Sequence, residues 1–122
     1  MFFVSHVVGD YLVQTDWQAT HKRGGLGRDR VARRALWSHA ATYTLAFAPA
    51  LIWLSGDLGA GVLWVAVLIG APHLGQDDGR VVDWWMRHVK RADPGTQPLV
   101  APEVDQTLHL VALLALALAA GA

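Results

Sequence analysis

Long apolar segments alternate with shorter polar ones along the chain. Residues 36–54 (LWSHAATYTLAFAPALIWL) and 58–75 (LGAGVLWVAVLIGAPHLG) contain no Asp, Glu, Lys or Arg. Residues 105–120 (DQTLHLVALLALALAA) begin polar and continue as Leu, Ala and Val, whereas residues 2–19 are apolar with polar interruptions. A membrane-crossing helix needs about 17 to 25 residues. The pattern therefore predicts four short spans over these ranges, the second of them kinked at Pro49.

A different pattern occupies the segment between the last two predicted spans. Residues 79–92 (GRVVDWWMRHVKRA) place Val, Trp and Met beside Arg and Lys, and residues 93–98 (DPGTQP) interrupt any helix that precedes them. This pattern predicts a short amphipathic helix in the headgroup region, with Trp at the interface and the cations towards anionic lipid. An ordinary exposed helix followed by a turn is the alternative.

Composition supports the membrane interpretation. Hydrophobic residues make up 53% of the chain and charged residues 16%, which is less charge than a typical soluble domain carries. We expect one membrane-embedded, all-α domain over residues 1–122, a polytopic helix bundle. Ten basic and ten acidic residues cancel, so no basic field indicates nucleic acid as a partner. The chain has no cysteine, which excludes disulfides and thiolate zinc sites.

The ten basic residues are sorted along the chain. All of them lie in residues 21–34 and 76–104, and none lies in the turn at residues 55–57. With four spans, both basic loops fall on one side of the membrane. The positive-inside rule makes that side cytoplasmic. We therefore expect a multi-pass protein of the inner (plasma) membrane with both termini outside, whose partners are the bilayer and anionic lipid headgroups at the basic face.

Ionisable side chains inside the predicted spans recur at a spacing of four residues. Three spans each carry a His and an Asp one helical turn apart, so that both lie on one helix face. Most of these side chains fall near the cytoplasmic ends of their spans, at a similar depth, and such groups usually face the interior of a bundle. The candidate metal ligands are His6, Asp10, His39, His73, Asp77, Asp105 and His109, with Gln14 and Gln106 as further polar site residues.

Imidazole and carboxylate ligands without thiolate suit zinc, manganese or iron. A helix bundle can hold one or two such ions between facing helices, and an open coordination position activates water. The leading hypothesis is a metal-dependent hydrolase that acts on a lipid-linked or amphiphilic substrate at the cytoplasmic leaflet. Asp10, Asp77 and Asp105 are the candidate catalytic carboxylates, one of which would serve as general base.

Two other functions fit the same residues. In the first, His and Asp pair with each other and hold the helices of a non-enzymatic scaffold or accessory subunit together. In the second, they form a pathway for ions or protons. Transport through four short helices would require an oligomer, and assembly into a homo-oligomer or a larger membrane complex is open in every case.

Two motifs resemble those of a known family. The opening HVVGDYLVQT and the closing DQTLH resemble the motifs H-x-x-[GA]-D-[FY]-x-x-Q-[TS] and D-Q-x-x-H of a bacterial integral membrane protein family known only as domain of unknown function 3307. A basic segment, an isolated helix His and an H-x-x-x-D pair lie between them. In HLGQDD, both Asp77 and Asp78 are alternatives for the last position. The resemblance covers almost the whole chain and implies the membrane fold and the polar set, but no reaction.

Overall fold

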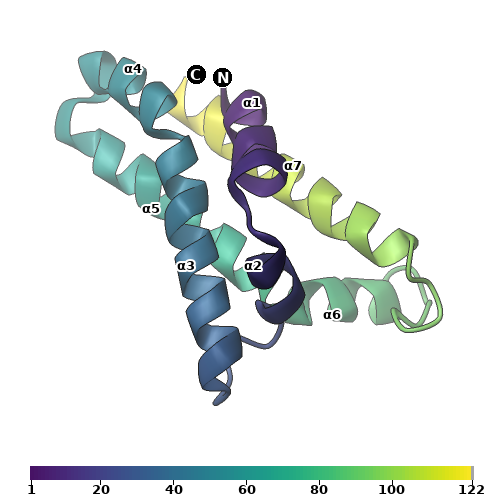
Figure 1. Cartoon of the computed structure of the whole chain (residues 1–122). Helices are drawn as coiled ribbons and strands as arrows, with labels where there is room; N and C mark the ends of the chain where they lie inside the picture. The colour runs from purple at the N-terminus through teal and green to yellow at the C-terminus, as the bar shows by residue number, and fades with distance from the viewer. Residues whose placement is uncertain (122) are drawn as a thin grey trace.

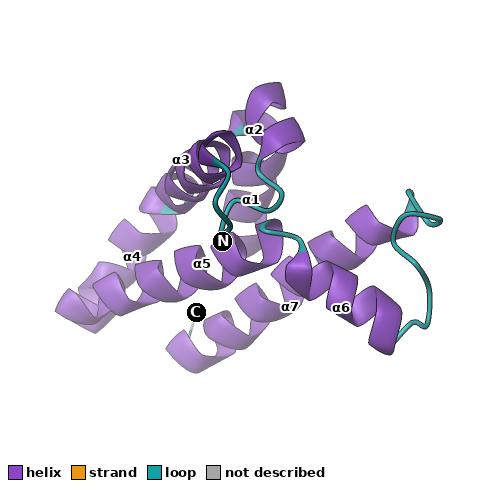
Figure 2. Ribbon diagram, turned by 90° about the horizontal axis from the view of Figure 1, so that it is seen from below, coloured by secondary structure: helices purple, strands orange, loops and turns teal. Residues whose placement is uncertain are grey.

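The computed structural model describes residues 1–121, in which every regular element is helical and none is a β-strand (Figures 1 and 2). The predicted all-α class is therefore confirmed. The elements are α1 (Phe2–Val7), the π-helix η1 (Val8–Val13), α2 (Asp16–His21), α3 (Arg30–Ala46), α4 (Ala48–Leu58), the 3₁₀ turn η2 (Gly59–Gly61), α5 (Val62–Asp77), α6 (Arg80–His88) and α7 (Val100–Ala120).

The helices form a bundle with two distinct ends. Helix α5 packs against both α3 and α7, while α1 and η1 pack against α3, and α1 also contacts α7. Both termini lie at the upper end in Figure 1, whereas α2, the start of α3 and α6 lie at the lower end. Helix α6 crosses the lower end and packs against α5 and α7. The two basic loops consequently share the end opposite the termini.

The first predicted span, residues 2–19, is divided in two. The helix ends at Val13, and Gln14 adopts an extended conformation with φ −60° and ψ 126°. Thr15 then begins α2 with a capping box, because its hydroxyl accepts from the Gln18 backbone N–H at 3.2 Å and its own N–H donates to the Gln18 side chain at 3.0 Å. At 1.5 Å per residue, the helix before the break reaches only about 18 Å.

The second predicted span, residues 36–54, covers the end of α3 and most of α4. The helix is interrupted at Phe47, two residues before Pro49, which sits at the start of α4. Because proline has no N–H to donate and its ring clashes with the preceding turn, it fits the first turn of a new helix better than the middle of a continuing one. The predicted kink is therefore confirmed.

The remaining helices follow their predicted ranges with shifted ends. Gly59, at a positive φ of 53°, turns the chain between α4 and α5, and α6 occupies the middle of the predicted segment 79–92. Helix α7 begins at Val100 instead of residue 105 and is 21 residues long. The sequence placed its start too late because the polar first turn lowered the local hydropathy.

Within residues 1–121, two helical stretches are long and apolar enough to cross a membrane. They are Ala48–Asp77, which includes α4, η2 and α5, and Val100–Ala120. Only 17% of the apolar window of each stretch is buried inside the protein. Most of their apolar surface therefore faces outward.

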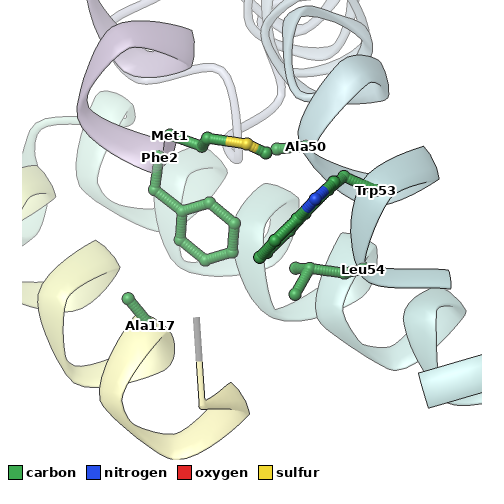
Figure 3. A pocket seen from close by; sticks show the side chains of 6 residues that line it. All are labelled: Met1, Phe2, Ala50, Trp53, Leu54 and Ala117. Atoms are coloured by element: carbon green, nitrogen blue, oxygen red, sulfur yellow. The ribbon is translucent and has the colours of Figure 1, made fainter. Parts of the chain in front are cut away.

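The buried apolar side chains gather towards the end that carries the termini. This apolar core consists of Phe2, Tyr43, Phe47, Ala50, Leu54, Val65, Ile69 and Leu113. Beside it lies a cavity of about 270 Å³ (Figure 3), whose lining residues are Met1, Phe2, Ala50, Trp53, Leu54 and Ala117. A smaller group, formed by Val82, Met86 and Val104, joins α6 to α7.

Candidate functional site

Four of the helical elements direct polar side chains into one buried cluster. Asp10 comes from η1, and the remaining members come from the faces of α3, α5 and α7 that meet inside the bundle. We call this set the polar cluster: Asp10, His39, His73, Asp77, Asp105 and His109. The three imidazoles are between 0% and 2% exposed. Lys22, which directly follows α2, also contacts the cluster, through its ion pair with Asp77.

Four ligand-type atoms of the polar cluster converge on one point. His39 Nε2 lies 3.0 Å from His73 Nε2, 3.2 Å from Asp10 Oδ1 and 3.0 Å from Asp77 Oδ2. His73 Nε2 lies 3.1 Å from Asp77 Oδ2 and 3.6 Å from Asp10 Oδ1. Tetrahedral ligands at about 2.0–2.2 Å from a zinc ion are about 3.3–3.6 Å apart. The spacing of these atoms is close to that of a metal's ligands.

Hydrogen bonds among residues 1–121, such as that between His39 Nε2 and His73 Nε2 at 3.0 Å, satisfy only part of this cluster. An imidazole nitrogen carries at most one proton, yet three acceptor-type atoms surround His39 Nε2 within 3.2 Å. Asp10 Oδ1 and both oxygens of Asp77 are buried without an aligned hydrogen bond to any residue in 1–121. Asp77 Oδ2 has the Lys22 ammonium at 2.9 Å. Because an unpaired buried polar atom costs about 1–3 kcal/mol, Asp10 Oδ1 and Asp77 Oδ1 are the oxygens for which a further partner would be most favourable.

His109 presents one nitrogen to the cluster in a defined state. Its Nδ1 lies 2.8 Å from the backbone carbonyl oxygen of Asp105. Since a carbonyl only accepts, Nδ1 must carry the proton, and Nε2 of the neutral ring keeps its lone pair. That Nε2 is buried, has no hydrogen bond to residues 1–121 and lies 3.6 Å from Asp77 Oδ1. Metal-binding histidines commonly donate their second nitrogen to a carbonyl in this way.

Lys22 is a member of the site that the sequence did not indicate. Its ammonium lies 2.9 Å from Asp77 Oδ2, and its side chain is 15% exposed. The Gln14 amide, oriented to satisfy its neighbours, accepts from Lys22 Nζ at 2.7 Å and donates to the Asp10 backbone oxygen at 3.3 Å. The break in the helix after η1 changes the direction of the chain, so that α2 carries Lys22 next to Asp77. Hydropathy assigned Lys22 to a solvated loop, so no sequence signal singled it out.

His6 and Gln106 join the site as neighbours of the polar cluster. His6 Nδ1 lies 3.0 Å from the Tyr43 hydroxyl and Nε2 lies 3.0 Å from Gln106 Oε1. Gln106 Nε2 in turn donates to Asp10 Oδ2 at 3.3 Å. Both nitrogens of His6 thus have protein partners, and this ring is better placed to orient Asp10 than to bind an ion. Tyr43 was likewise not singled out, although its ring stacks on His73 with centroids 3.4 Å apart.

The π-helix carries Asp10 to the cluster at a close approach to α3. A Cβ atom at Gly9 would lie 2.6 Å from Tyr43 Cδ2, so only glycine fits there without displacing the ring. Single π-helical turns inside helices occur frequently at functional sites, since they redirect side chains. Here the wider turn sets Asp10 opposite His39.

The structure separates the roles of the two neighbouring aspartates at the end of α5. Asp77 points into the polar cluster. Asp78 instead accepts from the Leu26 backbone N–H at 2.7 Å and pairs with Arg80 Nε at 3.0 Å, which fastens the first basic loop to the start of α6. Arg23 pairs with Asp83 across the same junction. Of the two alternatives in HLGQDD, Asp77 is therefore the one beside the histidines.

An opening connects the cluster to the lower end of the bundle. A pocket of about 190 Å³ lies between α2, α5, α6 and α7, and its polar lining includes Lys22, Arg23, Gln76, Asp77 and Asp105. Asp105 is the most accessible carboxylate of the cluster, with a side chain 23% exposed. Water and small polar groups can therefore reach Asp105 from the basic end, next to the buried Asp77.

Three overlapping sets of buried residues could hold a metal ion. Ligand atoms lie within 4.8 Å of one another in Asp10, His73 and His109, in His39, His73 and Asp77, and in Asp77, Asp105 and His109. All six residues were predicted as ligands from the sequence. His6, the seventh, lies next to them and belongs to none of the three sets.

The chain was compared with protein families, with curated proteins and with solved structures. No curated protein and no solved structure matches it. One family model matches residues 1–121, which is nearly the whole chain. The chain belongs to the family described as "Protein of unknown function (DUF3307)".

Proposed function

We propose that this chain is a multi-pass protein of the inner membrane whose polar cluster binds a divalent metal ion. The apolar stretches Ala48–Asp77 and Val100–Ala120 turn most of their surface outward, which favours lipid contact over burial in a soluble core. The basic loops share one end, which the positive-inside rule assigns to the cytoplasm, with four crossings and both termini outside. The first crossing is the short helix that ends at Val13.

Helix α6 lies at the interface in this arrangement. Trp84 and Trp85 are 55% and 37% exposed, while Val82 and Met86 are buried against the bundle. Exposed Trp beside Arg87 and Lys90 is typical of a helix in the headgroup region, where anionic lipids attract the cations. The pocket beside Asp77 and Asp105 then opens at the level of the cytoplasmic headgroups.

The mutual spacing of His39 Nε2, His73 Nε2, Asp10 Oδ1 and Asp77 Oδ2 carries the metal proposal. Five of the six separations among these atoms lie between 3.0 and 3.6 Å, close to the edges of a tetrahedron around one ion. An ion at that point would give Asp10 Oδ1 a partner and would add a second one to Asp77 Oδ2, which already pairs with Lys22. Two imidazoles and two carboxylates suit zinc, manganese or iron.

Charge supports the same conclusion. The site contains three carboxylates, from Asp10, Asp77 and Asp105, and one ammonium, from Lys22. Uncompensated charge in a buried site is costly. One divalent cation neutralises the two excess negative charges.

The chemistry that we propose is hydrolysis of a lipid-linked or amphiphilic substrate. A metal ion lowers the pKa of a bound water and supplies hydroxide near neutral pH. Asp105 lies outside the four-atom set, beside the pocket, where its carboxylate can accept the proton of that water. A substrate held in the bilayer would bring its headgroup to the pocket without leaving the membrane.

Elemental analysis of the purified, reconstituted protein tests the proposal. We expect at least one equivalent of zinc, manganese or iron, with loss of that metal in His39→Ala and in His73→Ala. His21→Ala and His88→Ala are the matched controls, because both rings are exposed and bond only within their own helices. A folded wild-type protein without stoichiometric metal would contradict metal binding. Metal without turnover of fluorogenic acyl or phosphoryl esters in lipid would contradict only the hydrolase.

One observation favours a structural alternative. Lys22 already supplies a cation to Asp77 at 2.9 Å, as expected of an ionic network that holds helices together without metal. The variant Lys22→Met separates the two proposals. A metal site keeps its ion and its fold when Lys22 is replaced, whereas a purely ionic scaffold loses assembly because Asp77 is left buried without its cation.

A further inference from the structure

The two oxygens of Asp77 face different partners. Oδ2 lies 3.0 Å from His39 Nε2 and 3.1 Å from His73 Nε2, within the four-atom set. Oδ1 instead lies 3.6 Å from His109 Nε2. Oδ2 also pairs with the Lys22 ammonium at 2.9 Å, whereas Oδ1 is buried without a hydrogen bond to residues 1–121. A carboxylate in this position can bind one cation through each oxygen.

The second side of Asp77 has its own ligand-type atoms. His109 is 1% exposed, and the carbonyl of Asp105 holds its Nδ1 proton, so the Nε2 lone pair is free to bind. Asp105 Oδ1 is also buried without a hydrogen bond to residues 1–121. One ligand atom from each of Asp77, Asp105 and His109 lies within 4.8 Å of the other two. Two carboxylates and an imidazole thus surround a point outside the four-atom set.

This second point borders open space. Asp77 and Asp105 line the pocket of about 190 Å³, together with Lys22 and Arg23. An ion there would have three protein ligands and free positions for water or substrate, as catalytic ions commonly do. The ion in the four-atom set would instead have four protein ligands.

We infer that the polar cluster is a dinuclear metal centre, in which Asp77 bridges a first ion in the four-atom set and a second ion bound by Asp105 and His109. The inference rests on the proposed function and refines it, since Asp105 becomes a ligand of the second ion. Two divalent ions and Lys22 outweigh the three carboxylates by two positive charges. Hydroxide and an anionic substrate group balance that excess, which indicates phosphate esters of amphiphilic alcohols as the substrate class.

Titration with Mn²⁺ tests the inference on the full chain in lipid nanodiscs after removal of bound metal with a chelator. Electron paramagnetic resonance reports both free Mn²⁺ and pairs of coupled ions. We expect the wild type to bind two equivalents, with an exchange-coupled signal from ions about 3.5–4 Å apart. His109→Ala and Asp105→Asn should each bind one equivalent and lose the coupled signal, while His88→Ala should behave as the wild type.

The outcomes separate this inference from the proposed function. A wild type that binds one uncoupled equivalent, or a second equivalent that survives both substitutions, overturns the dinuclear centre and leaves the first site in place. No binding at all contradicts both. Asp105→Asn keeps the test decisive if His109→Ala does not fold, because it preserves the shape of a partly exposed side chain.

Discussion

The apolar core and the polar cluster are built on the same helix faces, one turn apart. Along α3 the inward positions run from His39 through Tyr43 to Phe47, and along α7 they run from His109 to Leu113. Residues four apart share a helix face, so each helix changes from polar to apolar at a single level. The packing of the helices is therefore common to both regions, and only the chemistry of the buried atoms differs.

This difference is the basis for proposing a cation at one level and not at the other. The apolar core is closed by aromatic contacts, such as the edge-on pair of Phe2 and Phe47 with centroids 5.8 Å apart. In the polar cluster, Asp10 and Asp77 are equally buried and have oxygens without an aligned partner in residues 1–121. Substitutions at the two levels should consequently affect different properties.

The largest effect is expected from Asp77→Asn, which removes the carboxylate closest to all the other groups. We expect metal affinity to fall by about 100-fold or more, since even changes to groups around a metal ligand cost about 10–100-fold. Isothermal titration of the stripped protein measures this affinity. Asp57→Asn, at an exposed aspartate on the other end of the bundle, should leave affinity unchanged. Equal affinities in the two variants would place the metal elsewhere.

The apolar core should respond in the opposite way. Ile69, 2% exposed, lies one turn from His73 on α5. We expect Ile69→Ala to lower the free energy of unfolding by about 2–4 kcal/mol, because truncation of a buried Ile leaves a cavity. The metal-to-protein ratio of the folded fraction should stay at the wild-type value. Loss of metal together with stability would mean that the two levels are not separable.

The contact between Gly9 and Tyr43 tests how the π-helix positions Asp10. We expect Gly9→Ala to destabilise the protein by about 1–3 kcal/mol and to weaken metal binding, because the new methyl group displaces the Tyr43 ring. Gly56→Ala is the matched control, since no atom lies within 4 Å of a Cβ there. The two thermal unfolding midpoints measure the effect. If the two variants unfold alike, the close approach is not needed.

The smallest effect is expected at the boundary between the two levels. Tyr43→Phe keeps the stacked ring and removes the hydroxyl that pairs with His6 Nδ1 at 3.0 Å. We expect a loss of about 1 kcal/mol of stability and a decrease in metal affinity of less than about 10-fold. Chemical denaturation and metal titration measure the two quantities. An effect as large as that of Asp77→Asn would make Tyr43 a direct participant.

The sequence predicted the polar cluster well because the rule behind the prediction is local. A spacing of four residues puts His73 with Asp77 on one face, and a common depth from the helix ends brings them to the level of His39 and His109. That argument requires only regular helices, and it held for α3, α5 and α7. It could not separate Asp77 from Asp78, because the difference depends on which one bonds the Leu26 N–H.

The remaining features depend on contacts between segments far apart in the sequence. Packing of η1 against α3 sets the π-helix, the extended backbone of Gln14 and the turn that leads α2 back towards the bundle. Hydropathy does not show this packing, and it therefore predicted one unbroken span. The same return makes Lys22 a neighbour of Asp77. The sequence predicted His6 as a metal ligand because it lies four residues from Asp10, the same spacing as in the His73/Asp77 and Asp105/His109 pairs. Its hydrogen bonds to Tyr43 and Gln106 come from two other helices.

X-ray absorption at the edge of the bound metal tests the central claim most directly. We predict a first shell of nitrogen and oxygen atoms at about 2.0–2.2 Å, with outer-shell scattering from two imidazole rings when only the four-atom set is loaded with metal. One ring contribution should disappear in His39→Ala and in His73→Ala, and none should change in His21→Ala. A spectrum without imidazole scattering, or one that is the same in all four proteins, would contradict an ion held between His39, His73, Asp10 and Asp77.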